Sequence, residues 1–305
     1  MKARPFIAAF AIALLLVVAV LLAGAGKNKP VAATPTPAPA ETPGKDTAGS
    51  SAPLPVGLDI TWHGQSCFTM RTPGGTTVLM DPVAFEIGYK PPTVKADLVT
   101  ISHEHPDHNN LKMVEIAGNA AGGATVVRGL TEKGDWAVID QSVGDVHVTT
   151  VNTFHDDQQG KKFGKNAAFV FDVNLAQGGK RRLVHLGDLG QQLDEKQLAA
   201  LKPVDVLLVP VGGHYTVDGK GADKVIAALA PRFVIVPMHY KTPSLTVKEL
   251  GPVDPFLEGK TDRTVRVDGN NVEVQFGPFN FKAPGKIEGP DQMQTPMIVV
   301  LKPGS

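Results

Sequence analysis

Short apolar runs separated by turn residues recur along the chain from Leu58 onward. Several of them alternate apolar and polar positions, as Leu58-Asp59-Ile60-Thr61-Trp62 does, and this period of two is typical of strands with one buried face. The runs at 205–210 and 232–237 are almost continuously apolar, which is typical of strands buried on both faces. We predict strands at residues 58–62, 67–70, 76–80, 97–102, 124–128, 145–152, 166–173, 181–186, 205–210, 232–237, 264–267 and 272–276.

Three segments between these runs carry helical signals, at residues 110–117, 194–201 and 220–230. Strand-rich halves that each include helices predict an α+β fold, in which two mixed sheets pack together with helices outside. The apolar run at 297–301 is either an added edge strand or part of a loosely attached tail.

The N-terminus differs in character from the rest of the chain. Lys2 and Arg4 precede an unbroken apolar run from Phe6 to about Ala23, which predicts either a signal peptide or an uncleaved transmembrane anchor. Positive charge at the extreme N-terminus favours export of the rest of the chain. We therefore expect an exported protein, either membrane-anchored by this segment or secreted (periplasmic), with its folded domain outside the cytoplasm.

The pattern divides the chain into four parts. Residues 1–29 are the signal or anchor. Residues 30–55 are rich in Pro, Ala and Thr with few bulky apolar side chains, so they cannot bury enough surface to fold and predict a disordered linker. The folded domain is expected at 56–284, followed at 285–305 by a tail or edge strand.

Composition narrows the chemistry. The formal net charge of zero argues against a nucleic-acid partner. Cys67 is the single cysteine, so an intramolecular disulfide and a cysteine-rich metal cluster are both excluded. Any metal must be held by His and carboxylate side chains.

One polar run stands out directly after a predicted strand. His103-Glu104-His105-Pro106-Asp107-His108 follows the apolar residues 97–102 and brings four metal-competent side chains into six positions. Imidazole and carboxylate are ligands that zinc and similar divalent ions prefer. The ordinary alternative is a surface loop that happens to be rich in His.

Other potential ligands fall at the ends of other predicted strands. These are His155, Asp188, His214 and His239. Strands hold such junctions rigidly while loops admit substrate, so catalytic and ligand residues are expected there. The repeated placement favours a metal site over a chance cluster.

These positions resemble the metal signature of the metallo-β-lactamase-fold hydrolases, which implies a four-layer αβ/βα sandwich. Further stretches are similar to the subgroup of ascorbate-6-phosphate lactonase and related metal-dependent hydrolases, namely residues 60–68, 80–82, 96–99, 185–188, 211–216 and 237–240. The resemblance covers about residues 57–280. It is specific for the fold and much less specific for the substrate.

The resemblance implies two divalent ions, zinc first, with manganese or iron as alternatives. The implied ligands are His103, His105 and His155 for one ion, Asp107, His108 and His239 for the other, and Asp188 for both. Two ions about 3.5–4 Å apart can share a water or hydroxide, and a bound ion lowers the pKa of that water toward about 7. This implies hydrolysis of an ester-like bond, a lactone or a phosphodiester, in a small-molecule substrate, with Asp107 and Asp188 in the catalytic centre.

One position departs from the subgroup. Gly-His-Ser is usual where this chain has Gly64-Gln65-Ser66, so no role of that His is transferred. His63 points to the same face by strand alternation and is either a site residue or a partly buried structural His. His214 is expected to contact substrate or to give a proton to the leaving group, with Tyr215 as the alternative donor.

The remaining polar residues near strands have structural alternatives. Asp81 and Asp97 either support the metal ligands or cap their strands. His185 is expected to pack or to support the site without binding metal, and His147 to be exposed to solvent. The loops at 82–96, 156–166 and 240–246 are expected to shape the substrate pocket.

Two other classes of function stay open at this point. An iron-dependent oxidoreductase, a dioxygenase on the same fold, is one. The di-iron members that resemble this signature carry Glu where this chain has His105, which disfavours them but leaves a mononuclear dioxygenase open. The other class is a non-catalytic binding module that contains metal. Metal analysis with an oxygen-consumption assay separates the dioxygenase from a hydrolase.

Overall fold

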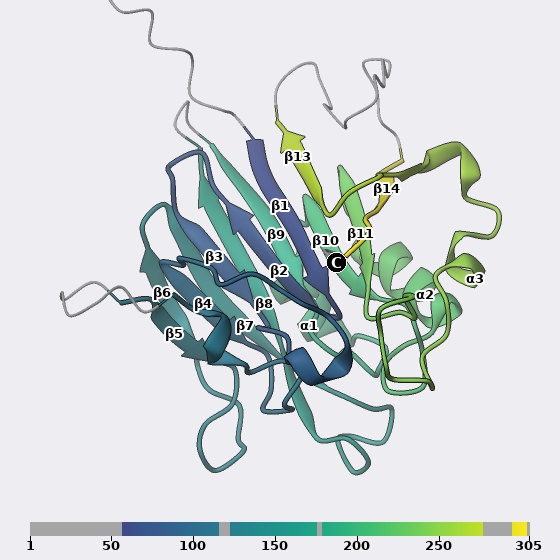
Figure 1. Ribbon diagram of the computed structural model, residues 1–305, viewed down its shortest axis with the longest axis horizontal. Coiled ribbons are helices and arrows are strands. Elements are labelled where there is room, and N and C mark those ends of the chain that lie inside the picture. The colour runs from purple at the N-terminus through teal and green to yellow at the C-terminus, as the bar shows by residue number, and fades with distance from the viewer. Residues whose placement is uncertain (1–56, 116–122, 176–178, 277–294, 304–305) are drawn as a thin grey trace, which may run out of the picture. The chain divides into compact units, whose positions relative to one another are not determined.

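The computed structural model describes residues 57–115, 123–175, 179–276 and 295–303. Two mixed β-sheets organise them (Figure 1). Both sheets contribute side chains to one hydrophobic core, so they pack face to face. The predicted α+β sandwich of two mixed sheets is confirmed.

The six-stranded sheet has the order β13-β1-β2-β3-β4-β5. Its strands β1 to β3 and β13 pair antiparallel, whereas β3, β4 and β5 run parallel to one another. The strands are β1 (Gly57–Gly64), β2 (Cys67–Arg71), β3 (Thr77–Met80), β4 (Leu98–Ile101), β5 (Thr125–Arg128) and β13 (Asn271–Gln275).

The eight-stranded sheet has the order β12-β14-β11-β10-β9-β8-β7-β6. Its first five strands are parallel and its last four pair antiparallel, with β9 belonging to both groups. The strands are β6 (Asp140–Val143), β7 (Val146–Phe154), β8 (Lys165–Asn174), β9 (Lys180–His185), β10 (Val206–Pro210), β11 (Val234–Met238), β12 (Thr264–Arg266) and β14 (Met297–Val300).

Strand alternation decides which side chains enter which core. In β3, Val78 and Met80 face the core between the sheets, while Leu79 faces a second, smaller core on the other side of the six-stranded sheet. In β4, Leu98 faces the core between the sheets and Val99 faces the smaller core. Every residue of β10 and β11 is buried, as their continuous apolar runs predict.

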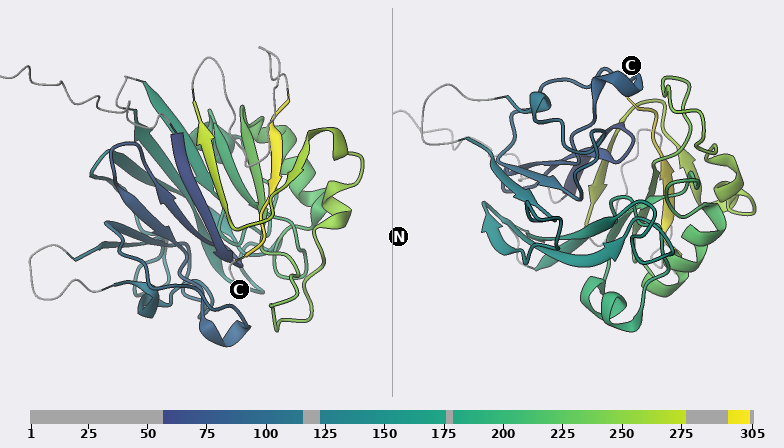
Figure 2. Two further views of the ribbon diagram at one scale, coloured as in Figure 1. Left: turned by 45° about the horizontal axis from the view of Figure 1, so that its top comes forward. Right: turned by 90° about the horizontal axis from the view of Figure 1, so that it is seen from below.

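Helices accompany the eight-stranded sheet, on its face away from the other sheet (Figure 2). Helix α2 (Gly219–Leu229) buries residues at helical spacing in the main core, namely Ala222, Val225, Ile226 and Leu229. The shorter α1 (Glu195–Leu201) begins with a capping box between Asp194 and Gln197. The small α3 (Asp254–Leu257) packs near α2.

Several elements differ from their predictions. The helix expected at 110–117 is only a single turn, η2 (Leu111–Met113), in the described residues, and residues 116–122 lie outside them. Strand β6, the turns η1 (Phe85–Ile87) and η3 (Thr261–Arg263), and helix α3 were not predicted. Residues of β14 have strand neighbours on both sides, so this strand lies inside the sheet and not at its edge.

The prediction of a transmembrane helix, a signal and an exported, membrane-anchored protein needs correction. Crossing a bilayer takes about 20 apolar residues in a helix. Within the part of the chain that the structure describes, no helix has the length and apolar composition for it, and α2 has 11 residues. The segments that prompted the prediction, 1–29 and 30–55, lie outside the described residues. We withdraw the membrane and export assignments.

Candidate metal centre

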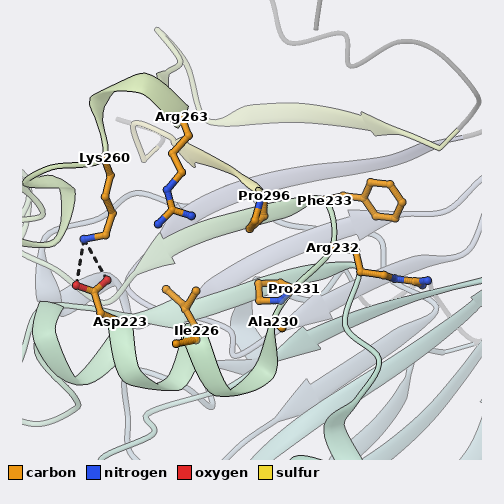
Figure 3. A pocket seen from close by; sticks show the side chains of 10 residues that line it. Asp223, Ile226, Ala230, Pro231, Arg232, Phe233, Lys260, Arg263 and Pro296 are labelled. Carbon is orange, nitrogen blue, oxygen red and sulfur yellow. Dashed lines mark hydrogen bonds and ion pairs between the residues drawn. The ribbon is translucent and has the colours of Figure 1, made fainter. Parts of the chain in front are cut away.

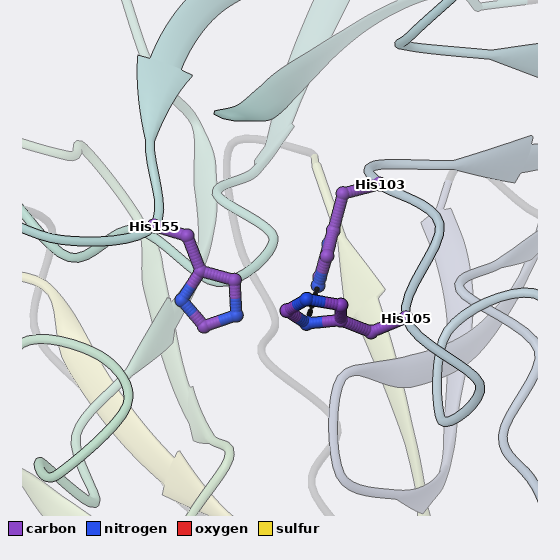
Figure 4. A group of neighbouring side chains, drawn as sticks. All are labelled: His103, His105 and His155. Carbon is purple, nitrogen blue, oxygen red and sulfur yellow. Dashed lines mark hydrogen bonds between the residues drawn. The ribbon is translucent and has the colours of Figure 1, made fainter. Parts of the chain in front are cut away.

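The predicted ligands converge at one edge of the two sheets. His103 and His105 come from the loop after β4, and His155 follows β7 directly, so that the three rings face one another (Figure 4). His103 and His105 have ring centroids 4.5 Å apart, and His103 and His155 have centroids 4.8 Å apart. The rest of the cluster consists of Asp107 and His108 from the same loop, Asp188 after β9 and His239 after β11.

Three groups of these side chains place their potential ligand atoms within 4.8 Å of one another. The groups are His103 with His105 and His155, His103 with His108 and Asp188, and Asp107 with His108 and His239. The structure therefore brings together all seven residues that the sequence singled out as metal ligands.

Asp188 lies at the middle of the cluster. Its Oδ2 atom is 3.1 Å from Nε2 of His108, 3.1 Å from Nε2 of His155 and 3.0 Å from Nε2 of His239. Its Oδ1 atom accepts a hydrogen bond from Ser66 Oγ at 3.1 Å. One carboxylate oxygen of Asp188 thus contacts three imidazole nitrogens, while the other is hydrogen-bonded to Ser66.

Backbone and side-chain acceptors outside the cluster fix the tautomers of three imidazoles. Nδ1 of His155 donates to the carbonyl of Tyr215 at 2.8 Å, and Nδ1 of His108 donates to Asp81 Oδ2 at 2.9 Å. Ser102 Oγ gives its proton to Asp81, so it accepts from Nδ1 of His103 at 2.9 Å. With the proton on Nδ1, each ring presents Nε2 to the centre as a ligand atom.

Charge in the cluster is balanced between carboxylates and imidazoles. Burial would lower the pKa of His108, but Asp188 and Asp107 beside it raise that pKa well above its ordinary value. Burial would raise the pKa of Asp188, but His108 and His239 hold it well below its ordinary value. Burial and the nearby His108 lower the pKa of His103 well below its ordinary value. Asp188 and Asp107 therefore favour positive charge at His108, whereas burial and that neighbouring charge disfavour it at His103.

Strained backbone accompanies the cluster. Asp81, His239 and Gln65 have φ values of 44°, 53° and 52°, in the left-handed region that side chains other than glycine rarely adopt. Such strain is found at sites whose geometry the surrounding structure imposes. Gly187, with φ of 55°, precedes Asp188, and a Cβ there would meet Asn166 Oδ1 at 2.4 Å. Only glycine therefore fits directly before Asp188.

Gln65 occupies the position at which the chain departs from the subgroup it resembles. Its Nε2 atom lies 3.1 Å from Asp107 Oδ2 and 3.0 Å from His239 Nε2, and the residue is 2% exposed. Its Oε1 atom is buried without a hydrogen-bond partner in the described structure. Gln65 is thus a member of the site that sequence reasoning left without a role.

Of the other residues that the sequence singled out, some contact the candidate ligands and others make only structural contacts. Asp81 supports the cluster through His108 and Ser102, whereas Asp97 accepts from the backbone of Thr77 and caps the strand ends. His63 is buried against Thr69, with Nε2 2.7 Å from the Thr69 hydroxyl.

His185 and His147 make hydrogen bonds outside the ligand cluster, whereas His214 lies next to a residue that lines the site. His185 donates to the carbonyl of Ser66 at 2.8 Å, and His147 bonds Asp140 on a partly exposed strand. His214 is exposed and its ring packs on Tyr215 with centroids 4.3 Å apart.

A hollow of about 330 Å³ opens over the candidate ligands. His105, Asp107, His155, Asp188 and His239 line it, and Tyr215 lines it as well. A larger hollow, about 700 Å³, lies at the opposite end of β11 between α2 and the residues after α3, where Lys260 pairs with Asp223 (Figure 3). None of the candidate metal ligands lines that larger hollow. We therefore place the chemistry in the smaller hollow.

The donor set fits divalent metal. Nε2 of His108 is buried and makes no hydrogen bond, although it lies 3.1 Å from Asp188. Nitrogen atoms that share a tetrahedral zinc ion with bonds of about 2.0–2.1 Å lie about 3.3 Å apart. Nε2 of His103 and Nδ1 of His105 are 3.0 Å apart. This contact is a hydrogen bond in the described structure (Figure 4), and its length is close to the separation that two nitrogen ligands of one ion have.

Comparison with known proteins gives the class first. A family model described as the β-lactamase superfamily domain matches residues 59–239. A crystal structure from Thermotoga maritima, described as belonging to the metallo-β-lactamase superfamily, is 33% identical with a TM-score of 0.53 and covers 80% of this chain and 98% of its own. Igni18, a metallo hydrolase from Ignicoccus hospitalis, has a TM-score of 0.53 at 23% identity, covers 72% of this chain and 100% of its own, and supports the fold alone.

Relatives in sequence narrow the class to one family. The UPF0173 metal-dependent hydrolase of Thermoplasma acidophilum is 31% identical over 200 residues, which are 61% of this chain and 84% of the relative. The UPF0173 metal-dependent hydrolase of Archaeoglobus fulgidus is 30% identical over 237 residues, which are 71% and 94%. The chain belongs to the UPF0173 metal-dependent hydrolases of the β-lactamase superfamily. This confirms the predicted hydrolase class, while the narrower likeness to ascorbate-6-phosphate lactonase stays a prediction.

Proposed function

We propose that this metal-dependent hydrolase uses two divalent ions to cleave an ester-like bond, either a lactone or a phosphodiester. Zinc is the first candidate ion, with manganese or iron as alternatives. The observation that carries the proposal is the approach of three imidazole nitrogens to one oxygen of Asp188, at 3.0–3.1 Å. The relatives are named metal-dependent hydrolases, which favours a hydrolase over a dioxygenase or a non-catalytic binding module.

We assign the ligands in two sets that share one residue. His103, His105 and His155 would hold the first ion, Asp107, His108 and His239 would hold the second, and Asp188 would contact both. When bound, two ions activate water near neutral pH and polarise the bond to be cleaved.

The rest of the cluster supplies orientation. Asp81 holds His108 directly and His103 through Ser102, so that both Nε2 atoms face inward before any ion arrives. The carbonyl of Tyr215 does the same for His155. Asp107 and Asp188 would offset the charge of the ions when these are bound, and Ser66 keeps Asp188 in place.

The leaving group requires a proton, and His214 and Tyr215 are the two donors that we propose. His214 is exposed and meets the pocket through its contact with Tyr215, whereas Tyr215 lines the pocket itself. His214→Ala and Tyr215→Phe variants separate them. The catalytic donor is the residue whose loss lowers kcat for esters with poor leaving groups while leaving activated esters unaffected.

Metal quantification on the purified full chain tests the proposal. We expect close to two equivalents of zinc or manganese, with hydrolysis of activated ester or phosphodiester probes. His239→Ala should retain about one equivalent, since it leaves the first ligand set intact. His147→Gln, on the partly exposed His147, is the matched control and should retain two. A metal content below one equivalent that Asp188→Asn does not change would contradict the two-ion proposal.

A further inference from the structure

The hollow over the candidate metal centre is lined by apolar side chains as well as by the candidate ligands. The apolar wall consists of Ile87 from η1, Phe163 from the loop after His155 and Val247 from the segment after β11. Among the described residues that line the hollow, none is Lys or Arg, and its carboxylate and imidazole side chains are Asp107, Asp188, His105, His155 and His239. Its volume of about 330 Å³ suits a small organic group.

Phe163 brings this wall close to one of the candidate ligands. Its ring centroid lies 5.5 Å from that of His155 and 5.4 Å from that of Tyr215. The Lys162 ammonium lies over the Phe163 ring at 4.4 Å from its centroid, and Lys162 does not line the hollow. Phe163 therefore lines the hollow, while the cation over its ring belongs to a residue that does not line it.

Asp156 holds the loop that presents Phe163. Its carboxylate accepts four backbone hydrogen bonds of 2.7–2.8 Å, from the N–H groups of Gln158, Gly160, Lys162 and Phe163. Bonds of this kind to an ionised carboxylate are stronger than neutral ones. The wall is thus formed before substrate arrives, which lowers the entropy cost of binding.

An anionic substrate would find no matching group on this wall. The two proposed ions would themselves meet the charge shared by the non-bridging oxygens of a phosphodiester. Selection therefore rests on the wall, whose side chains Ile87, Phe163 and Val247 offer apolar contact and no charged or hydrogen-bonding group. An uncharged ester brings no charged oxygen to this wall, and its apolar part gains free energy by leaving water.

We propose that this pocket selects an uncharged carboxylic ester or lactone whose apolar group packs against Ile87, Phe163 and Val247, in preference to a phosphodiester. The inference rests on the proposed function and chooses between its two bond types. In the reaction, the oxygen of water bonds to the acyl carbon, and the bond from that carbon to the alkoxyl oxygen breaks. The electron pair stays on the leaving oxygen, which takes up a proton from the proposed donor, His214 or Tyr215, and one of the two protons lost by the attacking water restores that donor. A carboxylate, an alcohol and one released proton result, in one molecule when the substrate is a lactone.

The test compares kcat/KM of the metal-loaded full chain for p-nitrophenyl acetate, butyrate and hexanoate with that for bis(p-nitrophenyl) phosphate. Burying one methylene corresponds to about a fourfold gain, so kcat/KM should rise about fourfold per methylene from acetate to butyrate. The esters should also exceed the phosphodiester. A flat chain-length profile, or a phosphodiester preferred tenfold, would overturn the inference while leaving the metal hydrolase intact. No hydrolysis of any probe at full metal loading would overturn the proposed function, and the inference with it.

Variants at Phe163 test whether this residue is responsible for the preference for longer acyl chains. Phe163→Gln should bring the butyrate-to-acetate ratio close to one, whereas Phe163→Leu, which keeps an apolar side chain, should retain most of it. The ratio does not depend on how much of a variant folds. Phe233→Gln, the same change in the larger hollow at the opposite end of β11, is the control and should keep the wild-type ratio. Equal ratios in Phe163→Gln and Phe233→Gln would overturn the role of Phe163.

Discussion

His63 illustrates how one buried imidazole makes stability depend on pH. It is 4% exposed, and burial lowers its pKa to about 4 from 6.5. Its Nε2 atom bonds Thr69, and its Nδ1 atom has no partner in the described structure. The folded protein therefore keeps His63 neutral at pH values at which the unfolded chain protonates it.

The sign of the effect follows from proton counts. Between pH 6.5 and about 4 the unfolded chain binds more protons at His63 than the folded one does, so stability falls as pH falls through this window. Between pH 7.5 and 5 we expect the His63 contribution to cost about 2 kcal/mol of unfolding free energy. The measurement is urea unfolding of wild type and His63→Gln at both pH values. Parallel pH dependences for the two proteins would show that His63 has the same pKa in the folded and unfolded states.

Residue roles were only partly predictable from the sequence. The positions after strands identified the seven candidate ligands that the structure brings together, because strand ends lie together at one sheet edge. Asp81 could not be told from a capping residue, since its contact with His108 depends on a left-handed φ of 44°. His214 also has a positive φ, of 60°, and is exposed, while its neighbour Tyr215 lines the pocket. Local backbone conformation of this kind leaves no sequence pattern.

At the scale of elements, the loop between His155 and Gly164 depends on a single carboxylate. Burial alone would raise the pKa of Asp156, but the four backbone N–H donors hold it below its ordinary value. An amide at this position offers one acceptor oxygen in place of two, so some of these N–H groups lose their partner.

Asp156→Asn should therefore loosen the loop. We expect faster amide hydrogen exchange at Gln158, Gly160, Lys162 and Phe163, by about tenfold or more, because each bond to a charged group contributes about 1.5–3 kcal/mol. Asp157→Asn, the same change at an exposed neighbour, is the control and should leave these rates unchanged. Equal exchange in both variants would mean that Asp156 does not hold the loop.

Elements were predictable where burial dictates the pattern. The continuous apolar runs of β10 and β11 indicated strands with both faces covered, and both strands appear. Strand β6, with the sequence Asp140-Gln141-Ser142-Val143, has no buried residue and lies at a sheet edge, so no apolar signal marks it. The order of strands in a sheet depends on contacts between segments far apart in the sequence. The position of β14 between β12 and β11 could therefore not be predicted from the residues of β14 alone.

For the whole domain, the candidate centre joins the two sheets. Residues 103–108 follow β4 of the six-stranded sheet, whereas His155, Asp188 and His239 follow strands of the eight-stranded one. Ions held by both sets would cross-link the sheets in the folded state and would be released on unfolding.

Metal removal should therefore lower the melting temperature. An ion at 100 times its dissociation constant adds about 2.7 kcal/mol, which corresponds to about 5–10 °C for a domain of this size. Thermal denaturation with and without EDTA measures the difference. Asp188→Asn should show a smaller EDTA effect than wild type. A melting temperature that zinc, manganese and EDTA all leave unchanged would mean that no ion bridges the sheets.

The inserted position of β14 has a consequence for synthesis on the ribosome. Chain growth delivers β11 and β12 before β14, yet β14 separates them in the finished sheet. While residues 297–300 are still inside the exit tunnel, two strand edges stay open, and open edges pair readily with other chains. The nascent protein must therefore keep a place for β14 between β11 and β12 until residues 297–300 leave the tunnel, and these two edges are exposed for that whole interval.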